Sequence, residues 1–116
     1  MRYLLMFHGF EDAQIAKGPL WLEEAMAFLL KFEDELALNS ELEWAETLDD
    51  EENSVVIGPG GETREGWYNE EGKPLRRLWA VRTSDPERIE QLAGQLAGEL
   101  DTWIEVRKTL PTAMRP

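Results

Sequence analysis

The chain has 116 residues, 42% hydrophobic and 31% charged, which is the composition of an ordinary soluble globular protein of one domain, residues 1–116. It has no cysteine, which excludes disulfides, thiolate catalysis and cysteine-based zinc sites. The formal net charge of −12 disfavours nucleic acids and anionic membranes, which attract proteins through Lys and Arg, so we expect neither as a partner.

The charge is uneven along the chain. Residues 1–53 hold 14 acids and 3 bases, whereas residues 54–116 hold 10 acids and 9 bases. The acidic half is either a solvated face that keeps the protein soluble or a docking surface for a basic partner. The apolar start is too short to span a membrane and lacks a signal-peptide cleavage site, so we expect a cytoplasmic protein.

The first elements in chain order are a strand and a helix. Residues 2–7 predict a strand that is apolar on both faces, and residues 9–18 a polar connection. Pro19 suits the first turn of a helix, which is expected to end at Asn39. Its apolar stripe comprises Leu22, Ala25, Leu29, Phe32 and Leu36.

The middle of the chain predicts short strands. Residues 41–48 alternate, with Leu42 and Trp44 on one face, and residues 54–58 and 62–68 form a hairpin around Gly58–Gly61. A phosphate-binding loop would need a helix after these glycines, but the following residues carry no helical stripe. We therefore interpret the glycine run as a turn.

The last third of the chain predicts a strand, a helix and a final strand. Residues 76–83 predict a strand that is again apolar on both faces, and Ser84 with Glu87 predicts a capping box. A second helix and a strand at residues 102–108 follow, and residues 108–116 form a C-terminal tail. The helix stripe comprises Ile89, Leu92, Ala93, Leu96 and Leu100.

This order of elements favours a ferredoxin-like α+β sheet with both helices on one face. Two helices cannot cover both faces of such a sheet, although the strands at 2–7 and 76–83 are apolar on both. A second copy of the chain is the simplest cover, so the pattern predicts a homodimer.

Several segments resemble the YCII-related family, also called the DGPF family: "MRYLLMFHG", "FEDELALNSELEWAETL", "REGWYNEEGKPLRRLWAVRTSD" and "IEVRK". Of the family's Asp-Gly-Pro-Phe stretch, which falls on Glu65–Tyr68, only Gly66 is kept, so the chain resembles a divergent member. The resemblance implies a dimeric α+β barrel of ferredoxin-like topology.

The resemblance also bears on function. Members with a proposed activity resemble lyases or hydrolases that use a His–Asp pair, with the histidine near the start of the first helix. Here that region reads "GPLWLEEAM" and has no histidine, so this assignment does not carry over. Relatives are often encoded near, or fused to, alternative sigma factors, which implies a regulatory setting. We therefore expect a small non-catalytic module that binds a ligand or a regulatory protein, without a cofactor.

Two residues are weak candidates for catalysis. His8, the only histidine, lies at a strand end and is either a general base oriented by Glu11 or Asp12, or half-exposed with a water or backbone partner. Glu33 falls inside the apolar arc of the first helix, where it either faces a pocket or reaches to solvent or an arginine. One histidine without cysteine argues against a metal site.

Aromatic and arginine residues are the candidates for ligand binding. Trp67, Tyr68 and Trp79 either line a ligand pocket or belong to the core or dimer interface. Arg82, with Arg76 and Arg77, either holds a carboxylate ligand or pairs with the acidic half of a second copy. The alternatives to a binding module are a lyase or hydrolase acting through His8 and a carboxylate, and a structural partner in an assembly.

Overall fold

The computed structural model describes residues 1–111, so the predicted tail at 108–116 lies partly outside the described residues. The described chain is a small mixed α+β fold with an antiparallel sheet and three helices. The elements in chain order are β1 (Arg2–His8), α1 (Glu11–Ile15), α2 (Pro19–Leu38), β2 (Leu42–Thr47), a 3-10 turn (Glu51–Asn53), β3 (Val55–Ile57), β4 (Thr63–Glu65), β5 (Leu75–Arg82), α3 (Pro86–Leu100) and β6 (Ile104–Lys108).

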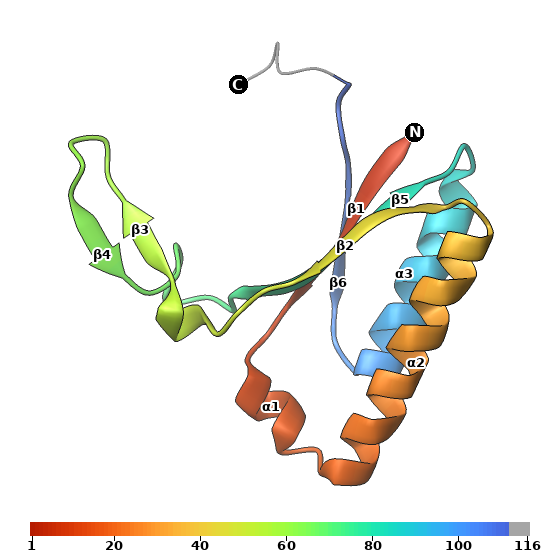
Figure 1. The fold of residues 1–116 in the computed structure, drawn as a ribbon, viewed down its shortest axis with the longest axis horizontal. Helices are drawn as coiled ribbons and strands as arrows, with labels where there is room; N and C mark the ends of the chain where they lie inside the picture. Colours follow the sequence, from red (N-terminus) through yellow and green to blue (C-terminus); the bar gives the residue numbers. More distant parts are fainter. Residues whose placement is uncertain (112–116) are drawn as a thin grey trace.

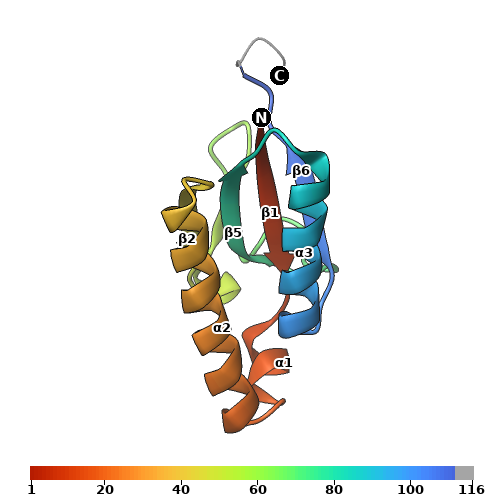
Figure 2. The same cartoon turned by 90° about the vertical axis from the view of Figure 1, so that its right-hand side faces the viewer.

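The main sheet has the strand order β2-β5-β1-β6, and every neighbouring pair is antiparallel. Helix α2 connects β1 to β2, and these two strands are not neighbours because β5 lies between them. Figure 2 shows α2 and α3 on the same side of this sheet, as predicted. Strands β2 and β6 remain edges, so the sheet of one chain is open and does not form a closed barrel. A barrel would require a second sheet.

The hydrophobic core lies between the sheet and the two long helices. Alternate residues of β1 (Tyr3, Leu5 and Phe7) point into it, together with Trp79 and Val81 of β5. The predicted helix stripes supply the other side, and their buried members are Ala25, Leu29, Phe32, Leu36, Ile89, Leu92, Ala93, Leu96 and Leu100. The helical periodicity of the sequence therefore identified the core correctly.

The opposite side of the sheet, which we call the open face, carries no layer of helices among the described residues (Figure 1). Because side chains alternate along a strand, Leu4 and Met6 of β1 lie on it. They pair with Ala80 and Leu78 of β5, and Trp44 of β2 pairs with Ala80 from the other side. The centre of the open face is thus apolar, and Trp44 is 41% exposed.

The β3–β4 hairpin stands away from the main sheet, on the side of the open face (Figure 1). Its turn is Gly58–Gly61, where Gly61 adopts φ +86°, so the glycine run is a turn as predicted. The hairpin gives the molecule extents of 44 × 44 × 20 Å and a radius of gyration of 15.8 Å. A compact domain of this length has a radius of gyration of about 13 Å. The hairpin is therefore an arm.

Three local predictions differ from the structure. A β-bulge at Glu43 lets β2 advance two residues, from Leu42 to Trp44, against one step of β5. Leu42 consequently packs on the core while Trp44 lies on the open face, although strict alternation predicted that they share a face. The N-cap residue of α3 is Asp85 and not Ser84. The carboxylate of Asp85 accepts a hydrogen bond from the backbone N–H of Glu87 at 2.9 Å.

The third difference lies between β1 and α2. The connection predicted for residues 9–18 contains the short helix α1, which buries none of its residues. A helix without a buried face leaves no apolar periodicity in the sequence. Its first turn holds Glu11 and Asp12, which favour a helix N-terminus because of the helix dipole.

Candidate functional site

An open groove of about 580 Å³ lies where the main sheet gives way to the hairpin arm. Its walls come from the end of β1, the connection after β2, strand β3, the loop after β4 and the segment before β5. Three residues predicted for the site, His8, Trp67 and Tyr68, line it together. The wall is largely apolar, and the charged residues Asp49, Glu51 and Lys73 also line it. The groove combines apolar surface with a few polar groups, as small-molecule sites do.

His8 is the only imidazole of the groove, and its side chain is 37% exposed. Its Nε2 lies 3.9 Å from Oε1 of Glu105, which is beyond hydrogen-bond distance. The predicted orienting carboxylates were Glu11 and Asp12, but the structure supplies Glu105 from β6 instead. The register explains this, because Met6 pairs with Glu105 and the antiparallel sheet places both on the open face near His8. The sequence signal for Glu105 was its alternation with Ile104 and Val106.

Trp67 and Tyr68 play different parts in the groove. The indole of Trp67 donates to the Gly72 carbonyl at 3.2 Å and meets the ring of Phe10 edge-on at 5.9 Å. Trp67 therefore fastens the loop after β4 to the segment after β1. Tyr68, by contrast, is 86% exposed and its ring is free to meet a ligand or another protein. Both residues lie in a loop, because the predicted strand at 62–68 ends at Glu65.

Trp79 and Glu33 lie together, but away from the groove. Trp79 is 1% exposed in the core, and its indole Nε1 donates to Oε1 of Glu33 at 2.9 Å. Glu33 thus lies inside the apolar arc of α2 because it accepts a hydrogen bond from a buried tryptophan. Trp79 is a core residue and lines neither this groove nor the one at the far end of the sheet. Sequence reasoning singled out both residues without pairing them, because they lie 46 positions apart.

Arg82 lies at the far end of the open face from His8, beside Arg2. The carboxylate of Glu43 pairs with both guanidinium groups. The hydrogen bond with Arg2 is the largest cause of the lowered pKa of Glu43. These three residues border a second groove of about 580 Å³, together with the segment that follows β6. The predicted binding residues therefore divide between the two ends of the sheet and the core.

The other two arginines of β5 also have carboxylate neighbours. Arg76 lies 3.6 Å from Glu51 of the 3-10 turn. Arg77 faces α2, where burial lowers its pKa and the charge of Glu33 opposes that shift. Neither arginine lines either groove, so the structure gives no support to a carboxylate ligand held by this pair.

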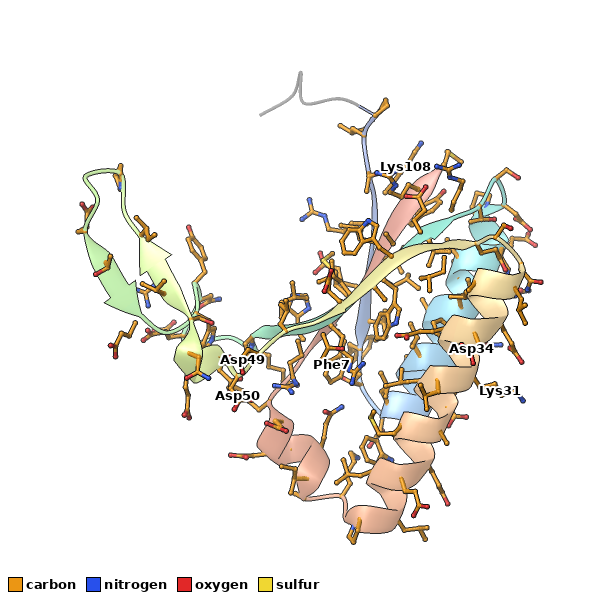
Figure 3. The ribbon with its side chains drawn as sticks, in the orientation of Figure 1. Phe7, Lys31, Asp34, Asp49, Asp50 and Lys108 are labelled. Atoms are coloured by element: carbon orange, nitrogen blue, oxygen red, sulfur yellow. The ribbon has the colours of Figure 1, made fainter. Side chains whose placement is uncertain are left out.

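Two carboxyl groups meet beyond the end of β1. A hydrogen bond with the carboxyl group of Asp50 favours the protonated form of Glu11 and raises its pKa. The negative charge of Asp50 raises the pKa of Glu11 further, because two carboxylates repel each other. The charge of Arg76 partly offsets this effect. Figure 3 shows Asp49 and Asp50 between the end of the sheet and the hairpin. This end of the molecule is therefore strongly acidic.

The comparisons with protein-family models and with curated proteins find no match to this chain. No helix within residues 1–111 has the length and apolar character needed to cross a bilayer. Within the same residues, no three His, Asp or Glu side chains are grouped as metal ligands would be. Function must therefore be argued from the groove and the open face.

Proposed function

We propose that this protein is a homodimeric, ferredoxin-like binding module in which two copies pair through their open faces. The observation that supports the proposal is the apolar centre of the open face, formed by Leu4, Met6, Trp44 and Leu78. The core on the helix side is filled, so these side chains need another surface to leave water. Two sheets packed face to face about 10 Å apart would supply it and give the dimeric barrel that the family resemblance implies.

In this proposal, the groove beside the hairpin holds the ligand. Its apolar wall and the exposed ring of Tyr68 suit a small molecule with a flat or apolar body, and Lys73 and His8 suit its polar groups. The resemblance to the YCII-related family suggests a regulatory setting. The module then acts by binding rather than by turnover.

The dimer is tested by sedimentation. The wild-type chain at micromolar concentration is expected to sediment at about twice the 13.4 kDa chain mass. Trp44→Glu places a charge at the apolar centre of the proposed interface and is expected to yield a monomer. Leu38→Glu is the matched control, because Leu38 is 84% exposed on α2, away from the open face, and its substitution is expected to leave the dimer intact. A monomeric wild type would contradict the proposal.

A lyase or hydrolase remains the second candidate, supported by one observation. His8 lines the groove, and the carboxylate of Glu105 lies 3.9 Å from its Nε2. Closure of this distance on substrate binding would produce an oriented general base. The exposure of His8 and the length of this contact favour the binding module.

A further inference from the structure

The open face has two ends of opposite charge. One end, which we call the arginine end, carries Arg2, Arg82 and Arg107; Glu43 pairs with Arg2 and Arg82, and Arg107 lies 3.9 Å from Glu105 of the next row. The other end, which we call the carboxylate end, carries five acids against Arg76 and Lys73; these acids are Glu46, Asp49, Asp50, Glu51 and Glu105. Figure 3 shows Lys108, which follows Arg107 in the chain, far from Asp49 and Asp50 of the carboxylate end.

The strand register places each charge. Arg2 pairs with Arg82, and Leu4 pairs with Arg107, so the arginines occupy the two rows nearest the start of β1. Met6 pairs with Glu105, and its partner Leu78 pairs with Glu46, so the next row is acidic on both edges. The apolar residues Leu4, Met6 and Leu78 occupy the middle positions of these rows. The charges are well placed to meet a surface that covers the centre.

We infer that the two copies pair with their strands in opposite directions, so that the arginine end of each lies over the carboxylate end of the other. The inference rests on the homodimer of the proposed function. A two-fold axis that runs across the strands produces this arrangement. An axis along the strands would instead stack arginines on arginines and acids on acids, and like charges brought together at an interface are costly.

This arrangement has a consequence for the groove. The groove lies at the carboxylate end, next to His8, and the hairpin arm stands on the same side of the sheet as the open face (Figure 1). The arginine end of the other copy therefore lies beside each groove. Arg82 of one copy then lies near His8, Trp67 and Tyr68 of the other copy. Within a single chain, Arg82 lies at the opposite end of the sheet from these three residues.

Charge reversal tests the orientation. Arg82→Glu with Arg107→Glu, or Glu46→Lys with Glu105→Lys, makes the two meeting ends alike in charge, and all four side chains are exposed in the single chain. We expect each double variant to raise the dissociation constant of the dimer at least about tenfold, and the fourfold variant to restore it. Added salt should weaken the wild-type dimer and strengthen both double variants. The control Glu23→Lys with Glu24→Lys changes the charge equally on the exposed side of α2 and should have no such effect.

A distance measurement tests the same point without changing the charge pattern of both ends. Because the chain has no cysteine, Arg82→Cys gives one spin-label site per chain. Opposed strands place the two labels at opposite ends of the sheets, about 20 Å or more apart along strands that rise about 3.3 Å per residue. Like ends together would bring the labels to about the 10 Å sheet spacing. A short distance, or a wild-type dimer that salt strengthens, overturns the inference and leaves the dimer standing, whereas a monomeric wild type overturns both.

Discussion

Glu33 and Trp79 show how one hydrogen bond explains an unusual residue. Trp79 fills the centre of the core, and a buried indole N–H needs an acceptor. Glu33 supplies it from α2 at 2.9 Å while the rest of its side chain remains only partly buried. The carboxylate therefore has a structural role, as the acceptor for a buried indole N–H.

This role predicts the effect of its removal. Glu33→Leu leaves the indole N–H of Trp79 buried without a partner, which should lower the free energy of unfolding by about 1–3 kcal/mol. Urea unfolding at one fixed protein concentration measures it. Asp34→Leu, on the exposed side of the same helix, should change stability by no more than about 0.5 kcal/mol.

A double-mutant cycle separates the hydrogen bond from general packing. In a Trp79→Phe background there is no N–H to leave unpaired, so Glu33→Leu should cost much less than it does in the wild type. Equal costs in the two backgrounds would show that Glu33 stabilises the protein in some other way.

His8 is the residue on which the enzyme alternative depends. His8→Ala is expected to leave the fold intact, at a cost of about 1 kcal/mol or less, because the side chain is partly exposed. It is also expected to remove no lyase or hydrolase turnover in a substrate screen at matched folded fraction. A working general base contributes about 10²- to 10⁴-fold in rate. A turnover present in the wild type that falls at least about a hundredfold in both His8→Ala and Glu105→Gln would establish His8 as the base.

At the scale of elements, Glu41 and Arg88 join the start of β2 to the first turns of α3. The guanidinium donates to both carboxylate oxygens, through Nε and an Nη atom, each at 2.9 Å. These hydrogen bonds hold the pKa of Glu41 below its usual value, and burial partly opposes the shift. A two-pronged pair of this kind fixes the orientation of both partners. It therefore holds α3 in place against the edge of the sheet.

The pair should make part of the stability depend on pH. Because the folded state lowers the pKa of Glu41, its contribution is full above the unfolded pKa of about 4.3 and is lost as the pH falls through the lower folded pKa. Glu41→Gln should therefore reduce the free energy of unfolding by about 1 kcal/mol at pH 7 and by progressively less in acid. Glu90→Gln on the exposed side of α3 is the control. A difference that stays constant down to about pH 3 would contradict the assignment.

At the scale of the whole molecule, the net charge is −12, but the charge is distributed unevenly over the surface. The arginine end of the open face carries only three arginines, one carboxylate lies between two of them, and the remaining surface is dominated by acids. Binding to a nucleic-acid backbone requires a basic surface that releases counterions. This molecule offers a small patch instead.

We therefore expect no salt-sensitive binding to duplex DNA at physiological ionic strength, whatever regulatory setting the family resemblance suggests. Fluorescence anisotropy with a labelled duplex checks this. Submicromolar binding that weakens steeply as salt is added would contradict the expectation. A basic DNA-binding domain measured under the same conditions is the positive control.

The sequence by itself determined the elements that bury a face. The apolar stripes of α2 and α3 predicted the two helices and the core. The strands at 2–7 and 76–83, which are apolar on both faces, predicted the uncovered face. These predictions were possible because a buried face requires apolar residues at the period of its helix or strand. The glycine run was also interpreted correctly, since turn chemistry is local. Helix α1 was missed because it buries nothing.

The tertiary structure alone decided which distant residues meet. The bulge at Glu43 moved Trp44 to the open face, and one residue of slip is enough to exchange the faces of a strand. The antiparallel register brought Glu105 to His8 and Glu43 to Arg2 and Arg82, and the packing of α2 on β5 brought Glu33 to Trp79. These pairings join residues far apart in the chain. Local sequence patterns report which face a side chain occupies, but register and packing fix its partner.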